Sequence, residues 1–418
     1  MELTKAEREM RNGSCGEGIR TAMEIVVRMG ELYGAQKLLP VSRAHIDAAA
    51  YTTIWEAGSD FVEYLAEHGA LCAVPTSINP LSRDIENWSR LGASADFAAK
   101  SERLEKAYLK MGVIPTWTCA PYQGENVPNF GEVVSWSESN AVCYVNSVLG
   151  ARAERLPDLM DVCCALTGRV PAFGRYLDEN RKGDLLITLE GFEQDTFCRQ
   201  DMAALLGYYA GELAGSRVPV IEGLPGRICK DALKALSAAS ASGGAVSLFH
   251  IVGHTPEAPV LKAVTDPDAV PRYTVVPENL ECLRSRLCTV SGEKADLVVL
   301  GCPHCSAEEL HVIAGLLKGR HVHPDCELWV MTSRSEAEKA AQVGDLQALE
   351  AAGAIITRDT CLMELDEGDG RWRGKNMITN SGKAVQYAPA ICSVQGRLES
   401  TEICVEAAIE GRLKGGGA

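Results

Sequence analysis

The sequence predicts an α/β fold in which short buried strands alternate with amphipathic helices. Short apolar runs recur along the chain, and most of them end in a polar or glycine-containing loop. Stretches with apolar residues at helical spacing lie between these runs. This alternation is typical of parallel sheets covered by helices. Since ligand sites in such sheets collect beyond the carboxyl ends of the strands, residues that follow the strands are the first candidates for function.

The expected elements follow from the two periodicities. Helical spacing predicts helices at residues 5–33, 54–68, 95–111, 202–213, 307–317 and 336–352. Strands are predicted at residues 38–41, 71–75, 113–118, 185–190, 218–222, 245–252, 297–300, 328–331 and 355–356. Ser94 is expected to cap the helix at 95–111, and Ser137 to cap a helix that starts beside Glu138. The charged segment 366–376 is expected to form a surface loop.

The length of 418 residues allows about two or three domains. A Leu-Pro-Gly segment at residues 224–226 marks the expected passage from an α/β N-terminal part, 1–225, to an α/β C-terminal part, 226–414. The glycine-rich tail at 415–418 is expected to be disordered. The chain is 46% hydrophobic and 23% charged, a balance that supports a large globular core.

Charge and composition narrow the range of partners. The chain carries 41 basic and 56 acidic residues, a net charge of −15. Because no basic block offsets this charge, neither nucleic acid nor an anionic membrane is expected as a partner. The first residues lack the layout of a signal peptide, and no apolar run approaches the ~18 residues that span a membrane. We therefore expect a cytoplasmic protein.

Three cysteines come just after apolar runs: Cys119, Cys302 and Cys361. Loops beyond the carboxyl ends of parallel strands share one edge, so these thiols can converge. Three thiolates without a surplus of nearby histidines suit an iron–sulfur cluster better than a hard cation. The alternative is that they are three of sixteen buried cysteines in the core. Without an export signal the cysteines are expected to stay reduced, and the others are assigned to the core.

The segment Cys302-Pro303-His304-Cys305 also fits two other kinds of site. A C-x-x-C pair can be a redox dithiol or half of a zinc site. Zinc is disfavoured because Cys163 and Cys164, the only other close pair, are adjacent within a helical pattern. A thiol redox protein stays open as an alternative.

A second short pattern, residues 379–383, suits an anion. A small turn with a hydroxyl, a glycine and an ammonium can hold a carboxylate or phosphate through backbone N–H groups. A solvated turn is the alternative. The glycine spacing of phosphate loops and of dinucleotide-binding turns is absent, which disfavours nucleotide chemistry.

With these segments in view, the chain resembles the large, catalytic part of the aconitase X family over nearly its whole length. The segments that carry the resemblance are residues 44–47, 115–122, 137–142, 146–152, 166–169, 248–250, 255–258, 301–304, 359–361 and 380–383. The resemblance implies an aconitase-like fold of several doubly wound α/β subdomains, with the active site at the carboxyl ends of strands. It implies a hydro-lyase, that is, a dehydratase. The swivelling β-barrel domain of aconitase-type enzymes is not recognised in this sequence, so a separate small subunit is implied.

The resemblance also implies roles for particular residues. Cys119, Cys302 and Cys361 would hold an iron–sulfur cluster of uncertain nuclearity, and Cys305 is a departure from the family pattern that could be a neighbour or a competing ligand. Glu138, His45 and His304 would serve catalysis, while a serine of the small subunit would be the base. A small anionic substrate would meet a larger set of polar residues: Thr76, Ser77, Tyr122, Ser139, Asn140, Arg152, Ser381, Gly382 and Lys383.

Members of the family dehydrate either cis-3-hydroxy-L-proline or mevalonate 5-phosphate. Residues 117–123 and 161–169 resemble the hydroxyproline branch more closely, so cis-3-hydroxy-L-proline is the expected substrate and mevalonate 5-phosphate the alternative. A C-x-x-C redox protein and a non-catalytic binding subunit rank lower.

Overall fold

The computed structural model describes residues 1–365 and 370–413, which form two compact units. Unit 1 holds Met1–Lys182 and residues 364–365, and unit 2 holds Gly183–Met363 and residues 370–413. The expected tail at 415–418 and the first part of the expected surface loop lie outside the described residues. The parts 1–225 and 226–414 stay a prediction.

Unit 1 is built on a parallel three-stranded sheet with the order β3-β2-β4, beside an antiparallel pair, β1-β5. Its strands are β1 (Leu38–Pro40), β2 (Ala44–Ile46), β3 (Thr76–Ile78), β4 (Ser135–Trp136) and β5 (Arg169–Pro171). Its α-helices are α1 (Lys5–Arg11), α2 (Glu17–Leu32), α3 (Tyr51–Glu67), α4 (Ala95–Lys110), α5 (Ser139–Ser147) and α6 (Met160–Thr167). Short 3₁₀ helices are η1 (Pro121–Gln123), η2 (Gly174–Tyr176) and η3 (Asp178–Arg181).

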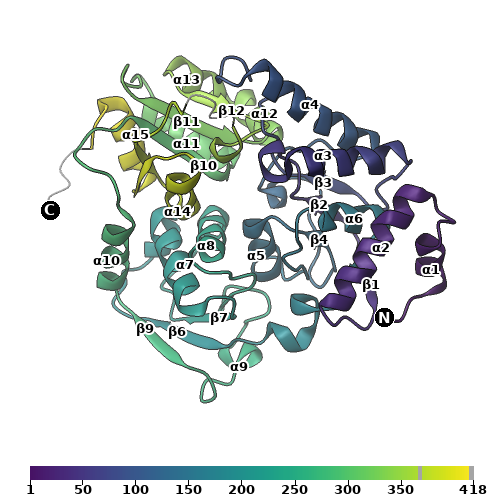
Figure 1. Ribbon diagram of the computed structural model, residues 1–418. Helices are drawn as coiled ribbons and strands as arrows, with labels where there is room; N and C mark the ends of the chain where they lie inside the picture. Colours follow the sequence, from purple (N-terminus) through teal and green to yellow (C-terminus); the bar gives the residue numbers. More distant parts are fainter. Residues whose placement is uncertain (366–369, 414–418) are drawn as a thin grey trace. The chain divides into compact units, whose positions relative to one another are not determined.

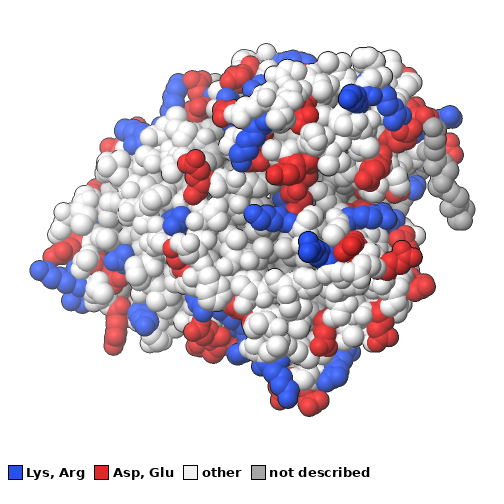
Figure 2. Space-filling model, turned by 180° about the vertical axis from the view of Figure 1, so that it is seen from behind, with Lys and Arg blue, Asp and Glu red and all other residues white. Residues whose placement is uncertain are grey.

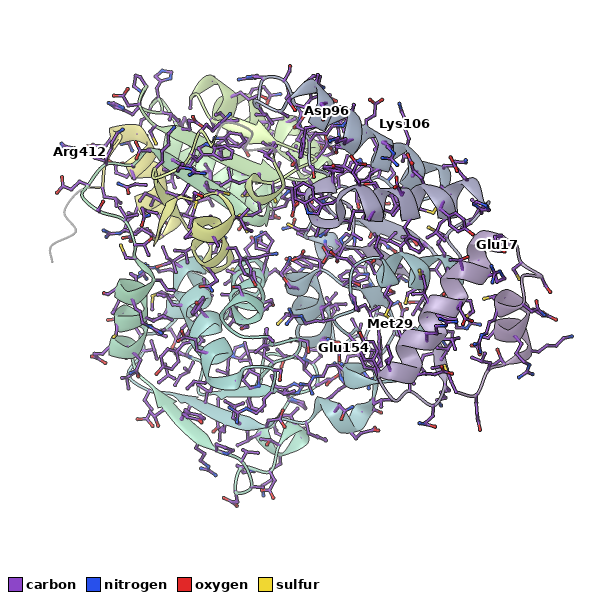
Figure 3. The ribbon with its side chains drawn as sticks, in the orientation of Figure 1. Glu17, Met29, Asp96, Lys106, Glu154 and Arg412 are labelled. Atoms are coloured by element: carbon purple, nitrogen blue, oxygen red, sulfur yellow. The ribbon has the colours of Figure 1, made fainter. Side chains whose placement is uncertain are left out.

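Helix α2 shows why these segments form helices. Met23, Val26, Val27 and Gly30 recur at helical spacing and are buried, so one stripe of the helix faces the core and packs against α6. Figure 3 shows Glu17 and Met29 towards opposite ends of this helix. The cap at Ser94 is confirmed, because its side chain accepts a hydrogen bond from the Phe97 N–H at 3.2 Å.

Three predictions for unit 1 were wrong. The helix expected at 5–33 is two helices, because Gly13 and Gly16 adopt φ of +89° and +98° between them. The strand expected at 71–75 is instead β3, a few residues later, where side chains are buried. Residues 113–118 form no strand. The Ile114 and Thr118 N–H groups donate to carbonyl oxygens of β3. Pro115 between them has no N–H to donate, so a regular ladder does not form.

Unit 2 contains two parallel sheets, ordered β8-β7-β6-β9 and β12-β11-β10-β13-β14. The first consists of β6 (Leu185–Leu189), β7 (Pro219–Glu222), β8 (His250–Ile251) and β9 (Arg272–Val275). The second consists of β10 (Leu297–Cys305), β11 (Glu327–Thr332), β12 (Ile355–Thr357), β13 (Asn376–Thr379) and β14 (Gln395–Leu398). The helices are α7 (Gln200–Ala214), α8 (Lys230–Gly243), α9 (Leu261–Val264), α10 (Pro277–Leu287), α11 (Ala307–Leu317), α12 (Arg334–Gln342), α13 (Asp345–Ala351), α14 (Gly382–Ile391) and α15 (Thr401–Glu410), with the 3₁₀ helices η4 (Thr196–Cys198) and η5 (Leu362–Glu364), the latter ending at the unit boundary.

Both sheets of unit 2 are doubly wound, and the predicted α/β class is confirmed. In the five-stranded sheet the chain moves from β10 outwards to β11 and β12, then returns to the other side of β10 with β13 and β14. The order therefore reverses between β10 and β13, the place where doubly wound sheets bind ligands. Figure 1 shows α11 and α15 beside this sheet, and both contact β10, while α14 contacts β10 and β14.

Most strands expected in unit 2 are confirmed, with two corrections to its elements. The strand expected at 245–252 shortens to His250–Ile251. The helix expected at 336–352 is α12 and α13, because Gly344 breaks it with φ of +86°.

Gly301 ends the regular part of β10. Its φ is +98°, and a Cβ there would clash with the Met331 carbonyl oxygen of β11. The β10–β11 register accordingly shifts between Leu300 and Cys305, the segment that contains Cys302.

Replacing Gly301 with alanine is expected to lower the free energy of unfolding by about 3 kcal/mol or more, since both the positive φ and the backbone clash oppose a Cβ. Denaturant unfolding would measure this loss. Gly315→Ala is the matched control: Gly315 lies in α11 with open space around it, so its replacement should leave stability unchanged or raise it by up to about 1 kcal/mol. Equal unfolding free energies for the two variants would contradict this account of Gly301.

Surface charge is mixed on the face shown in Figure 2. Lys and Arg side chains alternate there with Asp and Glu, separated by wide uncharged areas. Within residues 1–365 and 370–413, no helix combines the length and apolar character that a membrane crossing requires.

Candidate active site

Polar side chains gather at the carboxyl edge of the three-stranded sheet of unit 1. His45 belongs to β2, Asn79 directly follows β3, and Glu138 lies two residues after β4. All three are buried, with 0%, 6% and 7% of their surface exposed. Parallel pairing of β2 with both neighbours places them together at the edge where such sheets carry their sites.

Hydrogen bonds join these residues in a chain. His45 Nε2 lies 2.8 Å from Asn79 Oδ1, and His45 Nδ1 lies 2.9 Å from Ser77 Oγ. Asn79 Nδ2 donates to Glu138 Oε2 at 3.1 Å and also to Asp47 Oδ1. The side chains of β2, β3 and β4 are thus linked through one amide group.

The same contacts define the tautomer of His45. Carboxylates only accept hydrogen bonds, so the Asn79 amide nitrogen must point to Glu138 and Asp47, which turns Oδ1 towards the histidine. His45 Nε2 therefore carries the proton, and Nδ1 accepts one from Ser77. Burial lowers the pKa of His45 to about 4, and the ring is neutral at physiological pH. Both ring nitrogens are engaged, and His45 holds the Asn79 amide in place; its predicted catalytic role stays a prediction.

Stability should depend on pH through His45. An unfolded histidine protonates near pH 6.5, whereas the folded protein keeps His45 neutral down to about pH 4. Between these values the unfolded state binds more protons, so the His45 contribution is lost as pH falls through this window, by about 3 kcal/mol in total.

A His45→Gln variant isolates this effect. Burial raises the pKa of Asp161 to about 7, a shift with the opposite consequence, because a folded carboxyl that keeps its proton loses stability as pH rises. The unfolding free energy of the wild type therefore depends on pH through two groups, His45 and Asp161, whose effects oppose each other. We expect the difference in unfolding free energy between wild type and His45→Gln to shrink by about 3 kcal/mol from pH 7 to pH 4. A difference independent of pH would contradict the neutral assignment.

Glu138 is the N-cap of α5, which corrects the expectation for Ser137. Glu138 Oε1 accepts hydrogen bonds from the Asn140 backbone N–H at 3.3 Å and from Asn140 Nδ2 at 2.8 Å. Ser139 Oγ donates to the same oxygen at 3.1 Å. Ser137 Oγ is buried and has no hydrogen-bond partner among the described residues. The Glu138 carboxylate, rather than the Ser137 hydroxyl, caps the helix because it can accept several hydrogen bonds at once.

Asn140 connects Glu138 to the loop of the first cysteine. Asn140 Nδ2 donates to the Cys119 carbonyl oxygen at 3.0 Å, and Tyr122 Oη donates to Asn140 Oδ1 at 2.8 Å. Four predicted site residues, Glu138, Ser139, Asn140 and Tyr122, are therefore brought together beside Cys119. The Tyr122 ring also stacks on Tyr144 of α5, with ring centroids 3.9 Å apart.

The backbone around Cys119 is tightly held. Trp117, which is buried, adopts a left-handed φ of 42°, and the following Thr118 N–H donates to the Ile78 carbonyl at the end of β3. Thr118 Oγ1 in turn accepts the Ala120 N–H at 3.1 Å. Left-handed backbone at a bulky residue persists only where its surroundings impose it, and it is common at functional sites.

Two further predicted residues in unit 1 have local roles. Thr76 Oγ1 donates to the Val74 carbonyl at 2.8 Å. Arg152 lies beyond the carboxyl end of the nine-residue helix α5, a span of about 13 Å from its start, and pairs with Asp178. Their predicted binding roles stay predictions.

Sequence reasoning missed Asn79 and Asp47 in this cluster. Asn79 directly follows a strand, which is the signal used elsewhere, but the strand was expected at 71–75 rather than at β3. Asp47 follows β2, a strand that was not predicted.

In unit 2, His304 connects the segments that contain Cys302 and Cys361. Cys302 and Cys361 are half-buried, Cys302 in the irregular end of β10 and Cys361 after β12. His304 is fully buried, and its Nε2 lies 3.3 Å from the Thr360 carbonyl oxygen. A carbonyl only accepts, so Nε2 donates and the histidine holds the Cys361 loop against the Cys302 loop.

The turn at residues 379–383, predicted to bind an anion and called the anion turn below, lies where the strand order of the five-stranded sheet reverses, between β10 and β13. Ser381 caps α14, which begins directly after β13, and its Oγ accepts the Ala384 N–H at 3.0 Å. A Cβ on Gly382 would lie 2.8 Å from the Ala239 Cβ of α8, so only glycine fits this close approach. Lys383 is half-buried in the first turn. Since β13 neighbours β10, Ser381 and Cys302 follow adjacent strands.

A buried ion cluster, which sequence reasoning missed, connects the cysteine loop with this turn. Lys234 of α8 donates from Nζ to the His304 carbonyl at 3.1 Å and forms ion pairs with Glu309 and with Asp231, the latter at 3.4 Å. Burial disfavours the ammonium, but the carboxylates of Glu309 and Asp231 raise the pKa of Lys234 above its ordinary value.

From Glu309 the connection continues to the anion turn. Gln200 Nε2 donates to Glu309 Oε1 at 2.7 Å, and Asn380 Nδ2 donates to Gln200 Oε1 at 3.1 Å. Asn380 directly precedes Ser381. One polar chain therefore supports both the Cys302 loop and the start of α14. No sequence pattern marks it, because its members come from four separate helices and loops.

The residues present fit an iron–sulfur cluster. The proposed donors are thiols, on loops whose backbone is held in place, and Thr360 Oγ1, beside Cys361, is buried without a hydrogen-bond partner among the described residues. A hydroxyl in that position suits a donor to cluster sulfur. Cys119 belongs to unit 1, and Cys302 and Cys361 belong to unit 2. Within residues 1–365 and 370–413, no three His, Cys, Asp or Glu side chains form a ready metal site.

Comparison with known proteins places the chain in a family. Three family profiles, described as the first, second and third domains of aconitase X, match residues 1–179, 185–285 and 295–410. A cis-3-hydroxy-L-proline dehydratase of Pseudomonas aeruginosa is 42% identical over 409 residues, which are 97% of this chain and 69% of that protein. The chain belongs to the aconitase X family.

Other aconitase X proteins resemble it along their whole length. A phosphomevalonate dehydratase large subunit of Methanosarcina mazei is 36% identical, with 100% of this chain and 99% of that protein aligned. The crystal structure of Thermococcus kodakaraensis aconitase X in its holo-form superposes with a TM-score of 0.86 at 32% identity, covering 98% of this chain and 100% of that one. The resemblance inferred from the motifs is confirmed, and with it the aconitase X fold and a dehydratase, that is, a hydro-lyase.

Proposed function

We propose that this aconitase X chain is the large subunit of a dehydratase that removes water from cis-3-hydroxy-L-proline. The substrate is inferred from one observation, the 42% identity with a cis-3-hydroxy-L-proline dehydratase over nearly the whole chain. Mevalonate 5-phosphate is the second candidate. It is supported by the 36% identity with a phosphomevalonate dehydratase large subunit over 99% of that protein.

Cys119, Cys302 and Cys361 would hold an iron–sulfur cluster. When bound by three protein thiolates, such a cluster keeps one iron open and supplies a Lewis acid for the departing hydroxyl group. The buried hydroxyl of Thr360 and the histidine that ties the Cys361 loop to the Cys302 loop support this assignment. The solved Thermococcus kodakaraensis relative is a holo-form, which is consistent with a bound cofactor.

The acid group of the substrate would bind at the start of α14. The first N–H groups of a ten-residue helix and the Lys383 ammonium offer positive charge to a carboxylate or phosphate. The network of Asn380, Gln200, Glu309 and Lys234 holds this turn and the Cys302 loop in one arrangement. Ser381, Gly382 and Lys383 thus orient the substrate.

Glu138 is the group of unit 1 best placed to move a proton. Asn79, Ser139 and Asn140 donate to its two oxygens, which fixes the carboxylate and leaves it able to take up a proton or to orient the departing water. His45 holds Asn79, and His304 holds the Cys361 loop, so both serve as positioning residues. Tyr122 and Asn140 shape the same cluster next to Cys119.

The base that removes the substrate's α-proton is expected on a small partner subunit. The name "large subunit" of the Methanosarcina mazei relative supports a partner of this kind. A serine of that subunit's swivel domain would act as the base. Thr76, Ser77 and Arg152 complete the proposed set around the anionic substrate, Ser77 through His45.

The test is anaerobic purification with and without the co-expressed small subunit, followed by iron and sulfide analysis and assays with both substrates. We expect broad visible absorption, turnover only in the two-subunit complex, and a much higher kcat/KM for cis-3-hydroxy-L-proline. Turnover of mevalonate 5-phosphate alone would select the second substrate. A reconstituted protein without iron would overturn the cluster assignment and favour a thiol redox protein that uses Cys305.

A further inference from the structure

Two cysteines expected in the core are exposed on neighbouring loops of unit 2. Cys198 ends η4, in the connection from β6 to α7, and Cys229 caps α8 after β7. Strands β6 and β7 are parallel neighbours in the four-stranded sheet, so the loops at their carboxyl ends lie side by side. Neither cysteine belongs to the proposed cluster or to the substrate turn.

The two residues contact each other. Cys229 Sγ lies 3.9 Å from the Cys198 carbonyl oxygen. Cys198 Sγ also donates to the Arg227 carbonyl at 3.1 Å. The Cys229 thiol therefore lies against the backbone of Cys198, and the Cys198 thiol lies against the chain two residues before Cys229, so side-chain rotation is the movement that would join the two sulfur atoms.

A hydrogen bond holds the loops of Cys198 and Cys229 together. Asp195 adopts a left-handed φ of 59°, and its Oδ1 accepts the Arg227 N–H at 3.0 Å. Gly226 has φ of +74°, and a Cβ there would clash with the same oxygen. Because Asp195 and Arg227 fix the spacing of the loops, the two cysteine residues are held in contact before any bond forms.

We propose that Cys198 and Cys229 form a reversible dithiol site that exchanges with low-molecular-weight disulfides such as glutathione disulfide. A thiolate of Cys229 attacks one sulfur of the disulfide and releases one small thiolate, leaving a mixed disulfide. A thiolate of Cys198 then attacks the Cys229 sulfur and releases the second. The cysteine pair loses two electrons and two protons, and the small disulfide is reduced to two thiols.

The order of attack follows from the surroundings of the sulfurs. Cys229 Sγ accepts the Ala232 N–H at 3.4 Å in the first turn of α8, and Cys229 is exposed, so we assign it as the attacking residue. Burial, aided by Asp195, raises the pKa of the Cys198 thiol, so this residue is the resolving partner. Oxidation would remove the cap from α8, the helix whose Lys234 donates to the His304 carbonyl.

Equilibration of the anaerobically purified protein, with its small subunit bound, in graded glutathione buffers tests the proposal. Acid quenching, alkylation and non-reducing peptide mapping would follow. We expect one intramolecular link, Cys198 to Cys229, that reverses with excess glutathione. Cys198→Ser should accumulate the mixed disulfide at Cys229, whereas Cys282→Ser, at another exposed cysteine, should leave the link unchanged.

Mapping of the wild-type protein decides the question even if a variant fails to fold. Full alkylation of both cysteines across all buffers would overturn the proposal, and so would a link from either cysteine to a third one. The readout is independent of dehydratase activity, so the site and the proposed function can fail separately.

Discussion

Replacing Cys302 with serine is expected to remove the visible absorption of the cluster and to lower kcat by at least about a thousandfold. Cys302 is half-buried where β10 leaves the ladder, and we assign it as one of three thiolate ligands. Loss of a ligand would remove a Lewis acid that contributes several kcal/mol to the barrier reduction. Iron content, the visible spectrum and turnover in the two-subunit complex measure the outcome together.

Cys305→Ser is the matched control for this prediction. Cys305 is buried, and its carbonyl accepts a hydrogen bond from Thr332 Oγ1 at 2.8 Å, which indicates a structural place in β10. We expect this variant to keep its colour and most of its activity. A coloured and active Cys302→Ser protein would remove Cys302 from the ligand set. An inactive Cys305→Ser protein with an intact spectrum would favour the redox dithiol.

Replacing Glu138 with glutamine is expected to lower kcat by about a hundredfold to ten-thousandfold, the range that general acid–base groups contribute. The amide keeps the size of the side chain and one acceptor, so the cap of α5 survives. Its NH₂ group, however, would face the donating Asn79 amide, which disturbs the connection to His45. Steady-state kinetics, with the spectrum as a check on the cluster, measure the loss.

Ser137→Ala is the neighbouring control for Glu138→Gln. Ser137 Oγ is buried and has no hydrogen-bond partner among the described residues, so its removal should leave kcat and stability nearly unchanged. If Glu138→Gln retained full activity, Glu138 would be only a helix cap. If Ser137→Ala lost as much activity as Glu138→Gln, the hydroxyl would have a role in the bound complex.

The sequence predicted the residues at strand ends better than the strands themselves. Cys302 and Cys361 were found because strands β10 and β12 are apolar runs followed by polar loops, whereas Ser381 was found from its turn pattern without β13 being predicted. Strands β2 and β4 were missed because they are two or three residues long and carry polar side chains that the sheet buries. Such strands exist only because their neighbours complete the ladder, and periodicity cannot reveal that.

Helix ends also differ in whether local sequence or contacts with distant segments decide them. Ser94 was predictable as a cap because its side chain acts within one turn. Glu138 displaced Ser137 because its carboxylate also meets Asn79 from a distant loop. Gly13, Gly16 and Gly344 broke helices that apolar spacing alone predicted as continuous, since positive φ stops a helix whatever its pattern.

By itself the sequence determined the α/β class and, through its motifs, membership in the aconitase X family. These depend on local periodicity and on residue types, which the chain carries in order. Only the tertiary structure decided that His45 is neutral and bonded to Asn79, that Lys234 supports the Cys302 loop, and that Cys198 lies against Cys229. Each of these depends on contacts between segments far apart in the chain, where burial and hydrogen-bond geometry, rather than spacing, set the chemistry.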